Sequence, residues 1–369
     1  MRKNLKIIVF LYSLCMMIAG VTIILLSRNV AGFAEWHSEH IFPVFTNSVG
    51  MIFSLLPFSL FEVGVYTCIA GTLFYIIYLF ILLIVPSLRK KLKKAAINGI
   101  CVFLVVLSTS FMMLASNCIV NYDRATYAQM TNQKIMPSTK EELLSLCNIL
   151  ISDAKDLAGS ISVDEDGLFT TAGMDIKKEA RNSMQALGEE NAILSGHYPN
   201  PKPILSSKLM SMMNLTGIYS PITIEANYNK DVLDYVMPYT ICHELAHLKG
   251  FIREDEAGFI AYAACMKSET PEFRYSGTLS ALEYTLTAYY REATSEEYAR
   301  LCVKIPEQVR RDILANNVYW QQYQGKIAGL AEKANDSYLK VNAQEGGVKS
   351  YGRMVDLLLA EHRIGAEGI

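Results

Sequence analysis

Three long apolar runs fill most of the first third of the chain. They are Ile7–Leu26, Val63–Val85 and Ala95–Cys118, and none of them contains a charged side chain. An α-helix rises about 1.5 Å per residue, so each run is long enough to cross a hydrocarbon layer of roughly 30 Å. The pattern therefore predicts three transmembrane helices. A cleaved signal peptide is the alternative for the first run, although signal peptides have shorter apolar cores of roughly 7–15 residues.

Basic residues flank these runs at one side of the predicted membrane. Arg2, Lys3 and Lys6 precede the first run, and the cluster RKKLKK, residues 89–94, joins the second run to the third. Clusters of this kind stay in the cytoplasm. We therefore expect a multi-pass protein of the cell membrane with a cytoplasmic N-terminus, its loop 27–62 and its C-terminal domain lying on the outer face. Binding of RKKLKK to lipid headgroups or nucleic acid is the alternative explanation of that cluster.

The outer loop contains a weaker apolar stretch, residues 42–64. Pro43, Gly50 and Pro57 interrupt it. Such breaks are poorly tolerated in a lipid-exposed span, because they leave backbone groups without hydrogen-bond partners. The pattern favours an interfacial or re-entrant hairpin that lies over the membrane.

From residue 119 to residue 369 the apolar positions follow a helical period. The segment 138–159 opens with Ser138 and Thr139 ahead of Glu141 and Glu142, a capping-box pattern, and apolar residues then recur at steps of three and four. The segments 177–191, 270–293 and 352–363 have the same period. The pattern predicts one mainly helical domain after the membrane region.

The sequence HELAH, residues 243–247, lies in a predicted helix from Pro238 to Gly250. Residues four apart on a helix are neighbours, so His243 and His247 can bind one zinc ion at about 2.0–2.1 Å. Glu244 then reaches the zinc-bound water and acts as the general acid/base when that water attacks a peptide carbonyl. The motif predicts a zinc peptidase, and the alternative is an amphipathic helix that carries these residues by coincidence.

A catalytic zinc site needs three protein ligands and one open position. The pattern HExxHxxGxxH, which supplies a third histidine, fails because Arg253 occupies its last place. A second predicted helix follows the Gly250 turn, and its start offers Glu254, Asp255 and Glu256 as ligands. Acidic residues also stabilise the N-terminus of a helix, so some of the three serve only that end.

One stretch before the motif, residues 217–228, has the two-residue period of a β-strand. Ile222, Ile224 and Ala226 alternate there with polar residues. An edge strand at this place in a zinc peptidase binds an extended substrate as an additional strand. A purely structural strand is an equal alternative.

The run HELAHLKG followed by EDEAGFIAY resembles the glutamate-zincin metallopeptidases. The second helix of these enzymes commonly carries Glu-x-x-x-Asp or Glu-x-x-Ala-Asp/Asn. The resemblance implies a zincin-like domain with zinc ligands His243, His247 and Glu254, with Glu256 in reserve. Gly258 stands where these enzymes have an Asp or Asn that supports a ligand histidine.

The layout of nearly the whole chain is similar to a bacterial membrane-protein family with an HExxH motif, known as domain of unknown function 3810. The resemblance rests on the three apolar runs, NYDR at 121–124, the HELAH region, and NDSYLKVNAQEGGVKSYGRMVDLLLA at 335–360. It implies the membrane topology and the fold. The activity of that family is inferred from the same motif.

Composition and charge limit the classes of partner that the chain is expected to bind. The net charge is -2 and no basic tract lies outside the membrane region, which argues against a nucleic-acid partner. The expected partners are the lipid bilayer and a peptide or protein substrate. Four tyrosines on predicted helices after the motif are candidates to stabilise an oxyanion, and their spacing selects none of them: Tyr262, Tyr284, Tyr289 and Tyr290.

The sequence predicts a mainly α protein with three N-terminal transmembrane helices and a mostly helical zincin-like domain, 119–369, that contains a short β element. We expect zinc-dependent peptide hydrolysis with Glu244 as general acid/base. One alternative is a non-catalytic membrane sensor or assembly factor whose metal is structural or vestigial, with Asp255 or a cysteine closing the fourth position. Another is intramembrane proteolysis, which the charges of KGFIREDE disfavour because they are costly in lipid.

Overall fold

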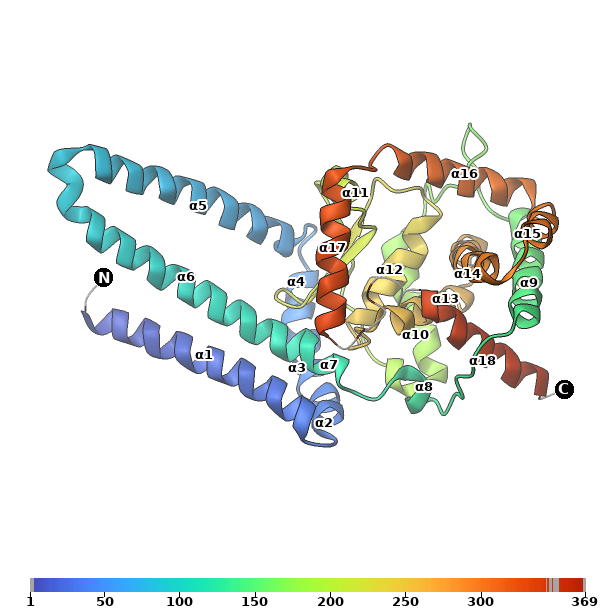
Figure 1. The fold of residues 1–369 in the computed structure, drawn as a ribbon, viewed down its shortest axis with the longest axis horizontal. Helices are drawn as coiled ribbons and strands as arrows, with labels where there is room; N and C mark the ends of the chain where they lie inside the picture. The colour runs from blue at the N-terminus through green and yellow to red at the C-terminus, as the bar shows by residue number, and fades with distance from the viewer. Residues whose placement is uncertain (1–2, 343, 345–346, 348–351, 368–369) are drawn as a thin grey trace.

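The computed structural model describes residues 3–342, 344, 347 and 352–367 of the 369-residue chain. A long arm of three helices extends from a mainly helical domain (Figure 1). The arm consists of α1 (Lys3–Asn29), α5 (Leu60–Ile84) and α6 (Leu92–Leu114). Three apolar stretches in this part are long enough to cross a membrane, which confirms the three predicted spans: Asn4–Asn29, Leu60–Ile84 and Pro86–Tyr122.

α1 and α5 contact α6 at different positions along the arm. α1 packs along α6, where Gly20 makes room for the Phe111 ring; a Cβ at Gly20 would lie 2.7 Å from that ring. α5 contacts α6 near their connecting turn, η2 (Pro86–Lys91), where the Tyr75 hydroxyl donates to the carbonyl oxygen of Ala95. This basic turn and the N-terminal end of α1 lie at the end of the arm away from the domain (Figure 1).

The outer loop, including most of the broken apolar stretch 42–64, forms short helices that pack on the domain, and residues 60–64 belong to α5. They are α2 (Phe33–His40), α3 (Phe42–Phe45), the π-helical turn η1 (Thr46–Gly50) and α4 (Met51–Ser54). The Lys202 ammonium donates to the carbonyl oxygen of Phe53 at 2.6 Å, and the Asn200 amide donates to that of Ser54 at 3.2 Å. The stretch therefore covers the sheet of the domain, and its contact with the membrane surface stays a prediction.

The domain is mainly helical, as predicted. The turn η3 (Ala115–Ile119) continues α6 into α7 (Val120–Tyr122), and Thr139 and Glu142 form the expected capping box at the start of α9. The predicted helices at 138–159, 177–191, 270–293 and 352–363 correspond to α9, α10, α14 and α18. The remaining bounds are α8 (Tyr127–Met130), α9 (Lys140–Ala158), α10 (Ile176–Glu190), η4 (Ala192–Leu194), α11 (Ser207–Met212), α12 (Val236–His247), α13 (Glu254–Met266), α14 (Pro271–Glu292), α15 (Ser295–Cys302), α16 (Glu307–Gln321), α17 (Lys326–Val341) and α18 (Met354–Glu367).

The expected single strand at 217–228 is a hairpin. β2 (Gly217–Ser220) pairs antiparallel with β3 (Glu225–Asn229), and β1 (Lys202–Ile204) pairs parallel with the other edge of β3. The alternation at Ile222 and Ile224 is therefore not strand geometry. The intervening turn puts Ile224 at φ 53, a conformation that β-branched residues rarely adopt, while its side chain is fully buried. The apolar residue at position 224 is explained by burial of its side chain within a turn and not by a strand.

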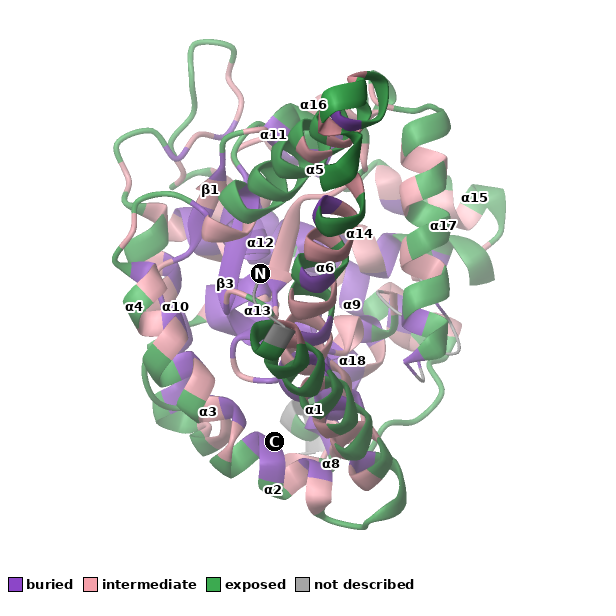
Figure 2. Ribbon diagram, turned by 90° about the vertical axis from the view of Figure 1, so that its left-hand side faces the viewer, coloured by how far each residue is buried: buried purple, intermediate pink, exposed green. Residues whose placement is uncertain are grey.

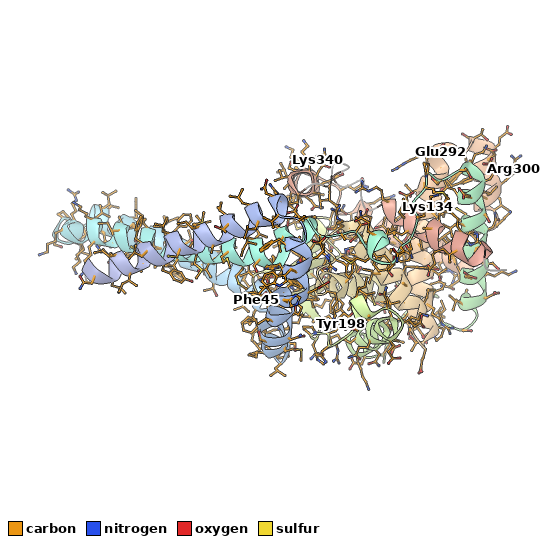
Figure 3. All side chains as sticks on the ribbon, turned by 90° about the horizontal axis from the view of Figure 1, so that it is seen from below. Phe45, Lys134, Tyr198, Glu292, Arg300 and Lys340 are labelled. Carbon is orange, nitrogen blue, oxygen red and sulfur yellow. The ribbon has the colours of Figure 1, made fainter. Side chains whose placement is uncertain are left out.

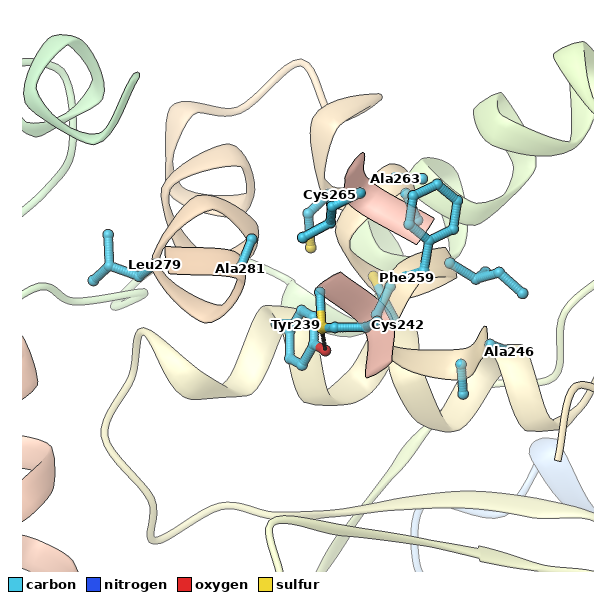
Figure 4. Packing of buried hydrophobic residues seen from close by; sticks show 14 of the residues in the cluster. Tyr239, Cys242, Ala246, Phe259, Ala263, Cys265, Leu279 and Ala281 are labelled. Carbon is cyan, nitrogen blue, oxygen red and sulfur yellow. Dashed lines mark hydrogen bonds between the residues drawn. The ribbon is translucent and has the colours of Figure 1, made fainter. Parts of the chain in front are cut away.

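The core lies where α12, α13 and α14 meet (Figure 4). Small buried side chains line the contacts, including Cys242 and Ala246 on α12, Cys265 on α13 and Ala281 on α14. Small residues let helix axes approach closely, which brings the start of α13 beside the last turn of α12. The buried centre contrasts with the exposed helices of the arm (Figure 2), and charged residues such as Glu292 and Arg300 lie at the opposite end of the molecule (Figure 3).

A buried ion pair joins the sheet to the arm. Lys202 on β1 and Glu225 on β3 are 2.6 Å apart, and both side chains are 2% exposed. The Glu225 carboxylate also accepts the backbone N–H groups of Leu60 and Phe61, at 3.1 and 2.8 Å, in the first turn of α5. One carboxylate thus satisfies two helix-terminal donors and one buried cation.

We expect Glu225→Ala to lower the free energy of unfolding by about 3–5 kcal/mol, because Lys202 would stay buried without a counter-charge. Denaturant titration of the detergent-purified protein measures this loss. Replacing Lys202 by Met and Glu225 by Leu together should recover part of it. As a control, Glu307→Ala breaks an exposed pair with Arg311 and should cost less than about 1 kcal/mol. Equal losses in the two single variants would contradict the role of Glu225.

Candidate metal centre

The motif HELAH forms the last turn and a half of α12, inside the core. Leu245 and Ala246 on this helix are fully buried, which fixes the direction of the neighbouring faces. The His243 and His247 rings lie one turn apart, with centroids 4.7 Å from each other. The predicted helix at 238–250 is therefore present, and its two histidines share a face as expected.

A tight turn connects α12 to α13. Gly250 adopts φ 79, and a side chain there would meet the Arg124 guanidinium, which donates to the carbonyl oxygen of Lys249 at 3.2 Å. The turn points the carbonyl oxygen of Phe251 back at the helix, where it accepts a hydrogen bond from His247 Nδ1 at 2.7 Å. This bond holds the neutral ring with its proton on Nδ1 and leaves Nε2 available to a metal.

Glu254 opens α13 beside the two histidines. Its Oε2 lies 3.0 Å from His243 Nε2 and 3.8 Å from His247 Nε2. One donor atom from each of the three residues lies within 4.8 Å of the others. Two imidazoles and one carboxylate in this spacing fit a catalytic zinc ion, which takes three protein ligands, and they also suit other divalent transition metals. The residues present therefore fit the expected metal.

The other two acidic residues of the turn are engaged elsewhere. The Glu256 carboxylate accepts the backbone N–H of Tyr127 at 3.0 Å, and burial, with repulsion from Asp255, raises the pKa of Glu256 to about 7. Asp255 lies 3.4 Å from the Arg353 guanidinium. The structure thus brings Glu254, and not the reserve candidate Glu256, to the histidines.

Burial also decides the charge state of His247. It lowers the pKa of this imidazole to about 4, against the opposing attraction of Glu254. The ring is therefore neutral near pH 7. A neutral imidazole is the form that binds a metal.

Glu244 lies under the first residue of β2. A Cβ at Gly217 would lie 2.7 Å from Glu244 Cγ, so only glycine lets this strand approach the carboxylate. Glu244 is 5% exposed, and its Oε2 has no hydrogen-bond partner within the described part of the chain. Burial, followed by repulsion from Glu254, raises the pKa of Glu244 well above its usual range.

Gly258, the departure from the zincin pattern, has a steric reason. A Cβ at this position would lie 2.9 Å from the hydroxyl oxygen of Tyr239, which donates to the Met354 sulfur (Figure 4). An Asp or Asn would therefore displace the tyrosine. Where such a side chain would accept a hydrogen bond from a ligand histidine, the carbonyl oxygen of Phe251 accepts one from His247 in this structure.

The three residues and Glu244 line a cleft of about 840 Å³. One wall is the segment 213–222, which includes the free edge of β2, and the opposite wall is α17 with Ala331, Asn335 and Tyr338. α17 crosses in front of this region in Figure 1. The described lining contains Glu244, Glu254 and Glu332 but neither Lys nor Arg.

The four candidate tyrosines could not be distinguished by their spacing, but they lie in different environments in the structure. Tyr284 on α14 lines the cleft, and burial raises the pKa of its hydroxyl. Tyr289 is fully buried, Tyr262 packs against the core, and Tyr290 is exposed. Tyr284 is therefore the oxyanion candidate among them.

Two features of the site were missed by the sequence reading. Gly217 was included in the predicted strand without a role, although an isolated glycine in a strand signals close approach of another group. The role of the Phe251 carbonyl oxygen could not be predicted from the sequence, because every residue type has the same backbone carbonyl group. The positive φ at Gly250 that aims it was visible only as a helix stop.

A protein-family model, described as Protein of unknown function (DUF3810), matches residues 37–359. The match includes the second and third spans, the cleft and the complete HELAH region. Part of the run 335–360 lies outside the described residues. No curated protein and no solved structure matches the chain.

We expect the full-length protein to bind one zinc ion per chain, and Glu254→Ala to lose it. Elemental analysis of the detergent-purified protein after dialysis measures the metal. Glu256→Ala is the matched control, since it makes the same change two residues further on and should retain the metal. Loss of metal in Glu256→Ala alone would contradict the assignment of the third ligand.

Proposed function

We propose that this chain, which belongs to the DUF3810 family, is a zinc metallopeptidase anchored in the membrane. The observation that carries the proposal is the convergence of His243, His247 and Glu254 at the wall of a cleft, with the buried Glu244 beside them. The resemblance of HELAHLKG and EDEAGFIAY to the glutamate-zincin metallopeptidases supports the same chemistry.

The position of each residue gives it a different role in the proposed reaction. His243, His247 and Glu254 would hold the zinc ion, which supplies a Lewis acid strong enough to make water a nucleophile near neutral pH. Glu244 takes a proton from the attacking water and passes it to the leaving amine, so that water is added across the peptide bond. The products are a carboxylate and an amine. Within the described residues the Oε2 atom of Glu244 has no hydrogen-bond partner, which supports this role.

The edge of β2 supports binding of an extended peptide. Strands pair through backbone groups, and Gly217–Ser220 offers such groups to the cleft on the side not paired with β3. A peptide added there passes Gly217, beneath which Glu244 lies. Its scissile bond would therefore lie next to the proposed base.

We place the domain on the outer face of the cell membrane. The basic residues of η2 lie at the end of the arm away from the domain, as does the start of α1 (Figure 1). Basic loops stay in the cytoplasm, so the domain falls on the opposite side. The site lies outside the three apolar stretches, which supports this arrangement over intramembrane proteolysis.

A non-catalytic sensor or assembly factor with a structural metal is the second candidate, and Gly258 is the observation that favours it. A structural zinc ion needs a fourth protein ligand. Asp255 points instead to Arg353, and the Cys118 thiol lies 3.0 Å from the Tyr338 hydroxyl. These contacts favour an open fourth position and hence the peptidase.

We expect Glu244→Gln to retain the metal and to lower peptide hydrolysis by at least about 100-fold, because general acid/base groups contribute this much or more. Cleavage of a randomised peptide pool, followed by mass spectrometry, measures the rate. Glu141→Gln, the same change at an exposed position of α9, is the control. Full activity in a metal-bearing Glu244→Gln protein would sink the proposed mechanism.

Tyr284→Phe tests the oxyanion role. Loss of one oxyanion donor lowers kcat by about 10²–10³ with little change in binding. We therefore expect kcat to fall while KM and metal content stay the same. An unchanged kcat would assign the Tyr284 ring to packing only.

A further inference from the structure

The axes of α5 and α6 separate toward the domain end of the arm (Figure 1). Near their connecting turn the Tyr75 ring packs on Gly99 and its hydroxyl bonds to Ala95. Towards the domain the two helices diverge (Figure 1). α5 is apolar and exposed along nearly its whole length, so in a bilayer it needs lipid or another helix beside it.

The two helices are attached to different parts of the domain. The first turn of α5 is held by Glu225, and the Glu62 carboxylate accepts the backbone N–H groups of Leu205 and Ser206, both at 2.8 Å. The continuation of α6 is held through Asn117, which donates to the carbonyl oxygen of Pro221 at 3.0 Å. These buried contacts keep the domain ends of α5 and α6 apart.

The cleft with the proposed metal site reaches the space between these ends. Phe61 of α5 lines it on one side, while Leu114 of α6 and the following Cys118 line it on the other. Ile222 and Ile252 continue the apolar lining toward the histidines. Figure 2 looks along the arm onto this face of the domain.

Helical spacing extends the apolar lining down into the arm. Phe103 and Leu107 lie eleven and seven residues before Leu114, so all three share one face of α6. Phe103 is 64% exposed and Leu107 48% exposed. On α5 the same rule puts Cys68 and Thr72 on the face of Phe61. We call these two helix faces, with Phe61, Cys68 and Thr72 on α5 and Phe103, Leu107 and Leu114 on α6, the lateral gap.

We propose that the substrate is a membrane-spanning protein, whose transmembrane helix lies in the lateral gap and whose adjoining outer segment unwinds into the cleft. This inference rests on the proposed function. A polypeptide inside lipid must satisfy its backbone hydrogen bonds internally, so a chain that enters from the gap is helical there. Only beyond the bilayer can it become the extended strand that the β2 edge binds.

The lining supports a protein occupant of this kind. The apolar surface runs from the gap into the cleft without Lys or Arg among the described lining residues, and ends at acidic and histidine side chains. An apolar helix followed by a neutral or basic segment is complementary to that sequence of surfaces. A lipid or a second copy of the chain in the lateral gap would not account for the apolar surface that continues into the cleft.

The test uses three peptide pools with the same short randomised segment. The first pool carries the segment next to a transmembrane helix of about 20 residues, the second next to a single acyl chain, and the third has no anchor. All are incubated with full-length protein in liposomes. We expect the first pool to be cleaved faster than the second by at least about tenfold, because the gap orients the helix. Equal rates for these two pools would overturn the proposal.

Substitutions in the gap give the matched comparison. Cys68→Trp fills the face of α5 that borders the gap, and it should bring the ratio of the first two rates toward one. Ile77→Trp places the same side chain on the opposite face of α5, where Ile77 is 54% exposed, and should leave that ratio unchanged. Equal ratios in the two variants would contradict a helix in the gap.

Binding is tested separately from cleavage. In a Glu244→Gln background, a photo-cross-linking residue at Leu107 should capture the first pool several times more than the same residue at Ile77. Equal capture at the two positions would overturn the proposal even if no pool is cleaved. Metal content and cleavage of the unanchored pool report on the peptidase itself, so failure of the gap and failure of the peptidase remain distinguishable.

Discussion

The Glu225 carboxylate is the interaction on which the arrangement of membrane and domain parts depends. It is buried with Lys202 in a three-stranded sheet, at the start of the middle strand, and it accepts the first N–H groups of α5. A charge this deep is tolerated only when every partner is present. The position of α5 is therefore tied to the folding of the sheet. The cleft depends on the same contact, because the sheet provides one wall and Phe61 of α5 lines another part.

Close helix packing fixes the positions of the candidate metal ligands. Cys242, Ala246, Cys265 and Ala281 leave little volume between α12, α13 and α14, so the start of α13 meets the end of α12. The six-residue connection then suffices to bring Glu254 to the histidines. A wider helix contact would need a longer connection, and the Phe251 carbonyl would no longer reach His247. Packing volume in the core thus sets the spacing of donors in the site.

Much of this architecture could be predicted from sequence, since it depends on periodicity. The spans, the helix with His243 and His247 and a second helix that begins within residues 253–262 all follow from apolar spacing and helix-stop signals. The hairpin was misread as one strand, because Ile224 is buried from a turn conformation that sequence alone does not indicate. The roles of Gly217 and Tyr284 depend on contacts between distant segments. Such contacts are properties of the tertiary structure. A glycine at 217 signals a close approach, but the local sequence does not identify Glu244 as the group that approaches.

The support of His247 by a backbone carbonyl has a consequence for how this site can change in evolution. A side chain that orients a ligand can be exchanged by a single codon, and the affinity for metal then varies with it. The carbonyl oxygen of Phe251 is present whatever residue occupies that position. Only an insertion, a deletion or a change at Gly250 can move it. The support of His247 is therefore insensitive to point mutation at residue 251 and sensitive to changes in loop length, and the affinity for the proposed metal would follow.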